Sequence, residues 1–143
     1  MKKFLTFALI ALSCVLAAVS CVKTNKESTS LGYSNIELTT VENQSITLTY
    51  KLSILTYSVT CSQEWKFSNG TCTSSILTEV CSMPGAVQDV IASLNGQYGE
   101  DKITINGNTI TIDSSEEFVG RSYEDVLKAV QVIKAGFESG FRI

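Results

Sequence analysis

The chain has 143 residues, of which 44% are hydrophobic, and this is enough for one small domain. It contains no histidine, which excludes a Ser-His-Asp or Cys-His catalytic arrangement and removes the commonest metal ligand. Beyond Lys2 and Lys3, nine Lys and Arg residues stand against fourteen Asp and Glu residues, and no basic cluster is present to bind nucleic acid or anionic lipid.

Residues 1–20 have the pattern of an export signal. Lys2 and Lys3 precede an apolar run, and small residues close the run at Ala18 and Ser20. A permanent transmembrane helix is the alternative, because about 20 apolar residues can span a bilayer. The Ser, Thr and Ala residues within the run and its processing-like end favour a cleaved signal.

Ala18-Val19-Ser20-Cys21 resembles the lipobox of bacterial lipoproteins, in which the signal is cut before a cysteine that carries a diacylglycerol. Alanine stands at position 18 where leucine is usual, so the motif is similar to the relaxed lipoboxes of spirochaetes. The resemblance implies that Cys21 is the mature N-terminus and carries fatty acid such as palmitate. Ala11-Leu12-Ser13-Cys14 is a second candidate, but cutting there would leave an apolar run behind. Ordinary signal-peptidase cleavage after Ser20 is the alternative, and it would release a soluble protein.

Residues 21–34 are predicted to form a polar tether, because the stretch contains little that could be buried. Several acyl chains can hold a protein at a bilayer without help from a basic patch. We therefore expect attachment to the inner or outer membrane of a bacterial cell envelope.

Alternation of apolar and polar residues from Asn35 onward predicts four antiparallel strands. The alternating residues are Ile36, Leu38, Ile46, Leu48, Tyr50, Leu52, Ile54, Tyr57, Val59, Cys61, Trp65 and Phe67, with Cys72 and Ile76 on the last strand. Turns are expected at residues 42–44 and at Asn69-Gly70, which is a strong signal for a two-residue hairpin. The change of phase at Ile54-Leu55 predicts a bulge or bend.

Two helices and one further hairpin are expected after residue 83. Pro84 suits a first helical turn and Gly96 a stop, and between them the apolar residues are Val87, Val90, Ile91 and Leu94, with Tyr98 beyond. Isoleucines on both sides of residues 106–108 predict the hairpin. Ser122 is expected to cap the second helix, whose apolar stripe consists of Tyr123, Val126, Leu127, Val130, Ile133 and Phe137.

This order predicts an α+β domain over residues 35–143, in which an antiparallel sheet of about six strands is covered on one face by two amphipathic helices. A small barrel is the competing interpretation. The segments 65–73 and 105–112 are similar to hairpins of lipocalin-like bacterial lipoproteins. That similarity carries no functional residue to this chain.

The remaining candidates for chemistry are thiols and carboxylates. One disulfide and one leftover thiol are possible among Cys61, Cys72 and Cys81. In an oxidising compartment we expect the disulfide to form and to stabilise the fold by roughly 3 kcal/mol. The spacing leaves the pairing open. The three cysteines lack the short spacing of a zinc site. The carboxylates Asp113, Glu116 and Glu117 could hydrolyse glycosides if one were held protonated, but a solvated loop is the simpler interpretation. We predict no catalytic residue, no metal and no cofactor.

The sequence thus predicts a non-enzymatic envelope lipoprotein that acts as a structural or interaction module, with an unidentified envelope protein as partner. The alternative is a lipocalin-like carrier of a small apolar molecule, with Tyr50, Tyr57 and Trp65 lining its cavity. A soluble secreted protein cut at the same site is the further alternative.

Overall fold

The computed structural model describes residues 32–54, 56–94 and 98–139; the predictions for Cys14, Cys21 and Gly96 lie outside these ranges. The elements, in chain order, are β1 (Gly32–Val41), β2 (Ser45–Ile54), β3 (Tyr57–Ser68), β4 (Thr71–Cys81), α2 (Pro84–Leu94), the 3₁₀ turn η1 (Glu100–Lys102), β5 (Ile103–Asn106), β6 (Thr109–Asp113), α3 (Ser115–Phe118) and α4 (Tyr123–Glu138). The predicted α+β class is confirmed. Because β1 begins at Gly32, it includes the last three residues of the predicted tether.

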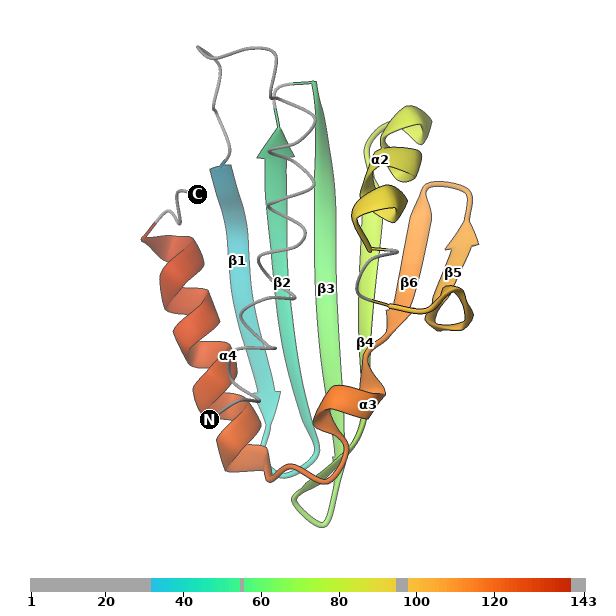
Figure 1. The fold of residues 1–143 in the computed structure, drawn as a ribbon. Coiled ribbons are helices and arrows are strands. Elements are labelled where there is room, and N and C mark those ends of the chain that lie inside the picture. The colour runs from blue at the N-terminus through green and yellow to red at the C-terminus, as the bar shows by residue number, and fades with distance from the viewer. Residues whose placement is uncertain (1–31, 55, 95–97, 140–143) are drawn as a thin grey trace.

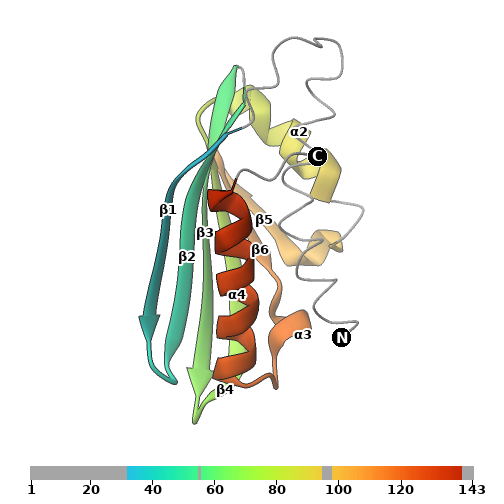
Figure 2. The same ribbon diagram turned by 90° about the vertical axis from the view of Figure 1, so that its left-hand side faces the viewer.

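The six strands form one antiparallel sheet in the order β1-β2-β3-β4-β6-β5 (Figure 1). The three α-helices lie on the same side of the sheet, and the other side carries no described helix (Figure 2). α4 packs against β1 and β2, whereas α2 and α3 pack against β4. Since β1 and β5 are its two edges, the sheet is open, and the barrel interpretation is wrong.

The predicted turns are confirmed, and the backbone angles explain why these residues form them. Asn69 and Gly70 have φ angles of 53° and 75°, as a two-residue turn that follows the twist of its strands requires. In the turn at residues 42–44, Asn43 also has a positive φ, and the Gln44 N–H donates to the Val41 carbonyl at 2.9 Å. Asparagine tolerates this left-handed conformation better than most residues, so both turns can be recognised from the sequence.

The predicted bulge or bend at Ile54-Leu55 is a reversal of the chain. β2 ends at Ile54 and β3 begins at Tyr57, and these two residues are paired across the strands. The apolar residues change from even to odd numbers because they lie on two successive strands that share one buried face.

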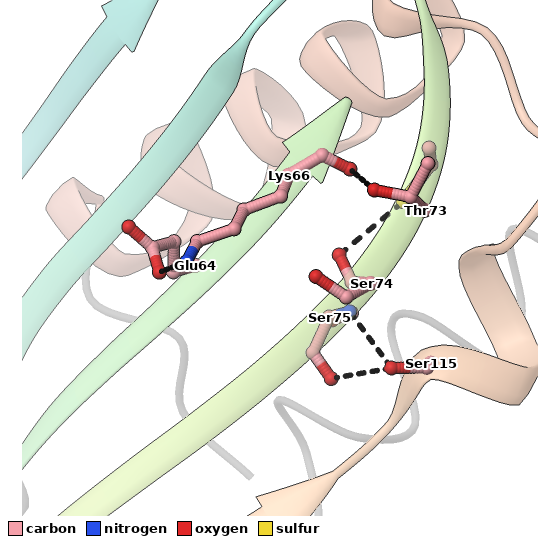
Figure 3. Close-up of polar contacts among 7 residues, drawn as sticks. Glu64, Lys66, Thr73, Ser74, Ser75 and Ser115 are labelled. Carbon is pink, nitrogen blue, oxygen red and sulfur yellow. Dashed lines mark hydrogen bonds and ion pairs between the residues drawn. The ribbon is translucent and has the colours of Figure 1, made fainter. Parts of the chain in front are cut away.

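A bulge occurs instead between β3 and β4, after the Asn69-Gly70 turn. Phe67 pairs with Cys72 and Lys66 pairs with Ser74, so Thr73 is the extra residue. The Thr73 hydroxyl donates to the Lys66 carbonyl at 3.2 Å across the bulge (Figure 3). The bulge shifts the alternation along β4 by one residue.

Because of this shift, the buried residues of β4 beyond the bulge are Ser75, Leu77, Glu79 and Cys81. Ile76, which the sequence placed on this strand, does lie on it but faces the opposite side and is half-buried. The buried face of the sheet therefore receives a serine and a glutamate in addition to apolar residues.

Both predicted helices are present. Ser122 caps α4, its hydroxyl accepting a hydrogen bond from the Asp125 N–H at 3.2 Å. The stripe of α4 is buried, except that Leu127 is only half-buried. After α2, Tyr98 is also buried, and its N–H donates to the Leu94 carbonyl at 3.0 Å. The helices therefore form the covering layer over one core.

Candidate functional site

Two of the three predicted cysteines lie near each other on the buried face of the sheet. Cys61 of β3 is opposite Glu79 of β4, and Cys81 follows Glu79 by two residues on the same face. Cys61, Glu79 and Cys81 are all at most 2% exposed. The two thiols are therefore diagonal neighbours, about 7 to 8 Å apart between Cα atoms in an ordinary antiparallel pair.

Cys72 lies apart from the other two thiols. It is opposite Phe67, six residues from Cys61 along β3, or roughly 20 Å at 3.3 Å per residue. A disulfide needs Cα atoms within about 7 Å of each other. The three thiols are free in the structure. The disulfide stays a prediction, and the strand register restricts it to Cys61 and Cys81, with a small adjustment of the strands.

The surroundings of these cysteines disfavour thiolate chemistry. Burial raises the pKa of Cys81 to about 11, and the nearby Glu79 and Cys61 add to the rise. Burial also raises the pKa of Cys72, although a backbone hydrogen bond with Ser74 and the charge of Arg121 oppose the rise. Because the thiolate is the reactive form of cysteine, these two thiols are poor nucleophiles near neutral pH.

Alkylation of protein taken from the envelope should count these thiols. In denaturant without reductant, we expect one labelled cysteine, Cys72, and after reduction all three, as measured by peptide mass spectrometry. In the native state Cys72 should react only slowly at pH 8, because it is buried and its pKa is raised. Three labelled cysteines in denaturant before reduction would refute the disulfide.

A buried polar cluster joins β3 and β4 to the start of α3. The side-chain amide of Gln63 donates to the hydroxyls of Ser75 and Ser114 at 3.1 and 3.4 Å, and the two hydroxyls are 2.7 Å apart. The Ser75 N–H donates to the Ser115 hydroxyl at 3.0 Å, which in turn donates to the Ser75 carbonyl at 3.4 Å (Figure 3). Because these bonds satisfy groups that water cannot reach, the cluster fixes α3 to β4.

The predicted carboxylate candidates are Asp113, Glu116 and Glu117. Lys102 lies near two of them, Asp113 and Glu116, and Arg121 lies near the third. Asp113 accepts from the Ser115 N–H at 3.0 Å, and hydrogen bonds from Ser115 hold its pKa below the ordinary value. Glu116 forms an exposed ion pair of 3.8 Å with Lys102. Burial raises the pKa of Glu117, and the charge of Arg121 opposes the rise.

The segment that holds these carboxylates is only partly the solvated loop that the sequence predicted. Ser115–Phe118 forms the short helix α3, Ser114 is buried, and Phe118 is 1% exposed. The Phe118 ring meets the Trp65 ring edge-on at 5.8 Å between centroids. The loop prediction was wrong here because a four-residue helix is too short to show an apolar period.

Two of the three aromatic residues proposed to line a carrier cavity, Tyr50 and Trp65, are packed against other rings. Tyr50 is 5% exposed and lies 4.6 Å from the Phe137 ring of α4, and Trp65 is fully buried against Phe118. Tyr57 is half-buried near one end of the sheet. Tyr50 and Trp65 therefore act as core residues that hold α4 and α3 on the sheet.

At one end of the sheet the described turn segments carry no charged residue, although Lys51 of β2 and Glu138 of α4 lie near the start of β1. There the hydrogen bonds and pairings bring together the start of β1, the β2–β3 connection, the start of α2 and the β5–β6 turn. The segments 53–58, 80–86 and 106–109 contain no Asp, Glu, Lys or Arg. At the opposite end the turns adjoin Glu42, Lys66, Arg121, Glu124 and Asp125. The turn segments at the two ends of the strands thus differ in charge.

Within the described ranges, no group of three His, Cys, Asp or Glu side chains could hold a metal ion. No helix in the described part of the chain is long and apolar enough to cross a bilayer. Comparison with family models, with curated proteins and with solved structures found no match to this chain.

Sequence reasoning missed three buried polar residues on the inner face of the sheet, Gln63, Ser75 and Glu79. Gln63 could have been found, because it stands two residues from both Cys61 and Trp65 in an alternating run. Ser75 and Glu79 could not, because the bulge at Thr73 changes the phase of β4 before them.

Proposed function

We propose that the protein is a lipid-anchored lipoprotein of a bacterial cell envelope, whose folded domain is a non-enzymatic interaction or structural module. The observation that carries the proposal is the signal-like segment that ends at Ala18-Val19-Ser20-Cys21. Acylation of Cys21 would supply the membrane affinity that the acidic domain lacks.

Three features of the domain support a non-catalytic role. The chain has no histidine, and Cys72 and Cys81 are buried with raised pKa values. Asp113 is held by a hydrogen bond from Ser115, and Glu116 by an ion pair with Lys102. The packing of Tyr50 and Trp65 against Phe137 and Phe118 favours this module over a carrier of a small apolar molecule.

Intact-mass analysis of the protein from its native membrane tests the anchor. We expect a chain that begins at Cys21 and is heavier than residues 21–143 by a diacylglyceryl group and any further acyl chain. A mass equal to residues 21–143 alone would indicate ordinary cleavage and a soluble protein. A chain that still begins at Met1 would indicate a permanent transmembrane anchor.

A further inference from the structure

We propose that the uncharged segments at the end of the sheet where β1 begins form a membrane-facing surface, which rests on the lipid bilayer that holds the anchor. This inference rests on the proposed acylation of Cys21. The inference identifies the part of the domain that contacts the lipid. The surface consists of Ser53 and the segments 56–58, 80–86 and 106–109, near the start of β1.

The first argument is the length of chain between the anchor and the sheet. Ten residues separate Cys21 from Gly32, where β1 begins. At 3.3 to 3.6 Å per residue, such a segment cannot span more than ~40 Å. The start of β1 therefore lies at most ~40 Å from the anchored end of the chain.

The second argument is the length of the sheet. β1 has 10 residues, so its far end lies roughly 33 Å from Gly32. The opposite end, with the turns at residues 42–44 and 69–70, could touch the bilayer only if the tether ran nearly fully stretched beside the sheet. The tether geometry therefore favours the end where β1 begins.

The third argument is that several segments are tied together at this end. The Ser82 N–H donates to the Ser58 carbonyl at 2.8 Å, and the Ser58 N–H donates to the Ser82 hydroxyl at 2.8 Å. The Cys81 N–H donates to the Asn108 carbonyl at 2.9 Å. These bonds hold the start of β3, the entry to α2 and the β5–β6 turn as one surface beside the start of β1 (Figure 1).

The fourth argument is the chemistry of the surface. Of the six large hydrophobic side chains exposed in the described part, three lie here or directly beside it: Val80, Met83 and Ile105, at 42%, 48% and 49% exposure. Tyr57 adds an amphipathic ring, a side chain favoured at membrane interfaces. Charged residues stand around this surface, on β2, α2 and α4. An uncharged surface with exposed apolar groups fits the interface of a bilayer and needs no anionic lipid.

Site-directed quenching in vesicles tests the orientation. The full, acylated chain carries one fluorophore, attached at Met83→Cys or, as the matched control at the opposite end, at Glu42→Cys. The vesicles are phosphatidylcholine with a small fraction of lipid that bears a nitroxide on its headgroup. Thiol labelling of the unsubstituted protein gives the background from the native cysteines, of which Cys61, Cys72 and Cys81 are buried.

We expect several-fold stronger quenching at Met83→Cys than at Glu42→Cys. The ratio should be unchanged between about 50 and 500 mM salt, because no charge pairing is involved. Thr56→Cys provides a second probe at the same end if the Met83 variant does not fold; Thr56 is exposed.

The other possible outcomes contradict either the lipid anchor or the membrane-facing surface. Protein that does not float with the vesicles would contradict the anchor itself. Protein that floats with equal quenching at both positions, or with stronger quenching at Glu42→Cys, would leave the anchor intact and refute the membrane-facing surface. Quenching between labels on neighbouring copies, without quenching by lipid, would refute it in favour of self-association.

Discussion

Phe137→Ala is expected to lower the free energy of unfolding by about 3 to 5 kcal/mol. Phe137 is 3% exposed near the end of α4, and its ring lies 4.2 Å from the ring of Tyr33 and 4.6 Å from that of Tyr50. Removing it would leave a cavity between α4 and the first two strands, and it would remove two aromatic contacts. Urea denaturation followed by circular dichroism measures the change.

Val132→Ala on the same helix is the matched control. Val132 is 70% exposed, so its truncation should change stability by less than about 0.5 kcal/mol. Equal effects of the two substitutions would mean that the aromatic contacts do not hold α4 on the sheet. The arrangement of α4 over β1 and β2 would then be wrong.

Phe118→Ala is expected to cost a similar amount, about 3 to 5 kcal/mol, and to shift the fluorescence of Trp65. Phe118 is 1% exposed on α3 and meets the Trp65 ring edge-on. Trp65 is the only tryptophan of the chain, so the indole emission comes from this site alone. A cavity that admits water should move the emission to longer wavelength.

Val119→Ala, next to it in the sequence, is the control for Phe118→Ala. Val119 is 54% exposed, and its truncation should leave both the stability and the emission of Trp65 nearly unchanged. If Phe118→Ala also leaves the emission unchanged, the contact between Phe118 of α3 and the Trp65 ring would be contradicted.

Much of the fold could be predicted because local sequence and tertiary structure agree. Asn69-Gly70 supplies the positive φ angles of its turn, and Ser122 supplies the hydroxyl that caps α4. The stripe of α4 repeats at helical spacing and is buried in the structure, apart from half-buried Leu127. At each of these places a few neighbouring residues carry enough information to determine the local conformation.

The rest of the fold depended on pairing between distant residues. The bulge at Thr73 is a property of how β3 and β4 align, and it turned Glu79 and Cys81 inward and Ile76 outward. The helix α3 is a single turn held by hydrogen bonds between Ser115 and Ser75, which are forty residues apart. No periodicity reveals such contacts, because the partners come together only in the folded sheet.

The candidate sites were predicted less completely than the fold. Sequence spacing left the pairing of the three thiols open, and the strand register separates Cys72 from Cys61 and Cys81. The uncharged segments at the end of the sheet where β1 begins could not be recognised as one surface, since they are separate in the chain. Only the register brings the segments around Ser58, Ser82 and Asn108 to the same place.

Detergent phase partitioning of the protein expressed in a bacterial host that acylates lipoproteins tests the anchor at Cys21 most directly. The wild type should enter the detergent phase, and Cys21→Ala should enter the aqueous phase or remain uncleaved. Cys14→Ala is the control, because Cys14 ends the second lipobox-like sequence, and it should behave as the wild type. A wild type found wholly in the aqueous phase, or a Cys21→Ala protein cleaved and held in the detergent phase like the wild type, would contradict a lipid anchor at Cys21.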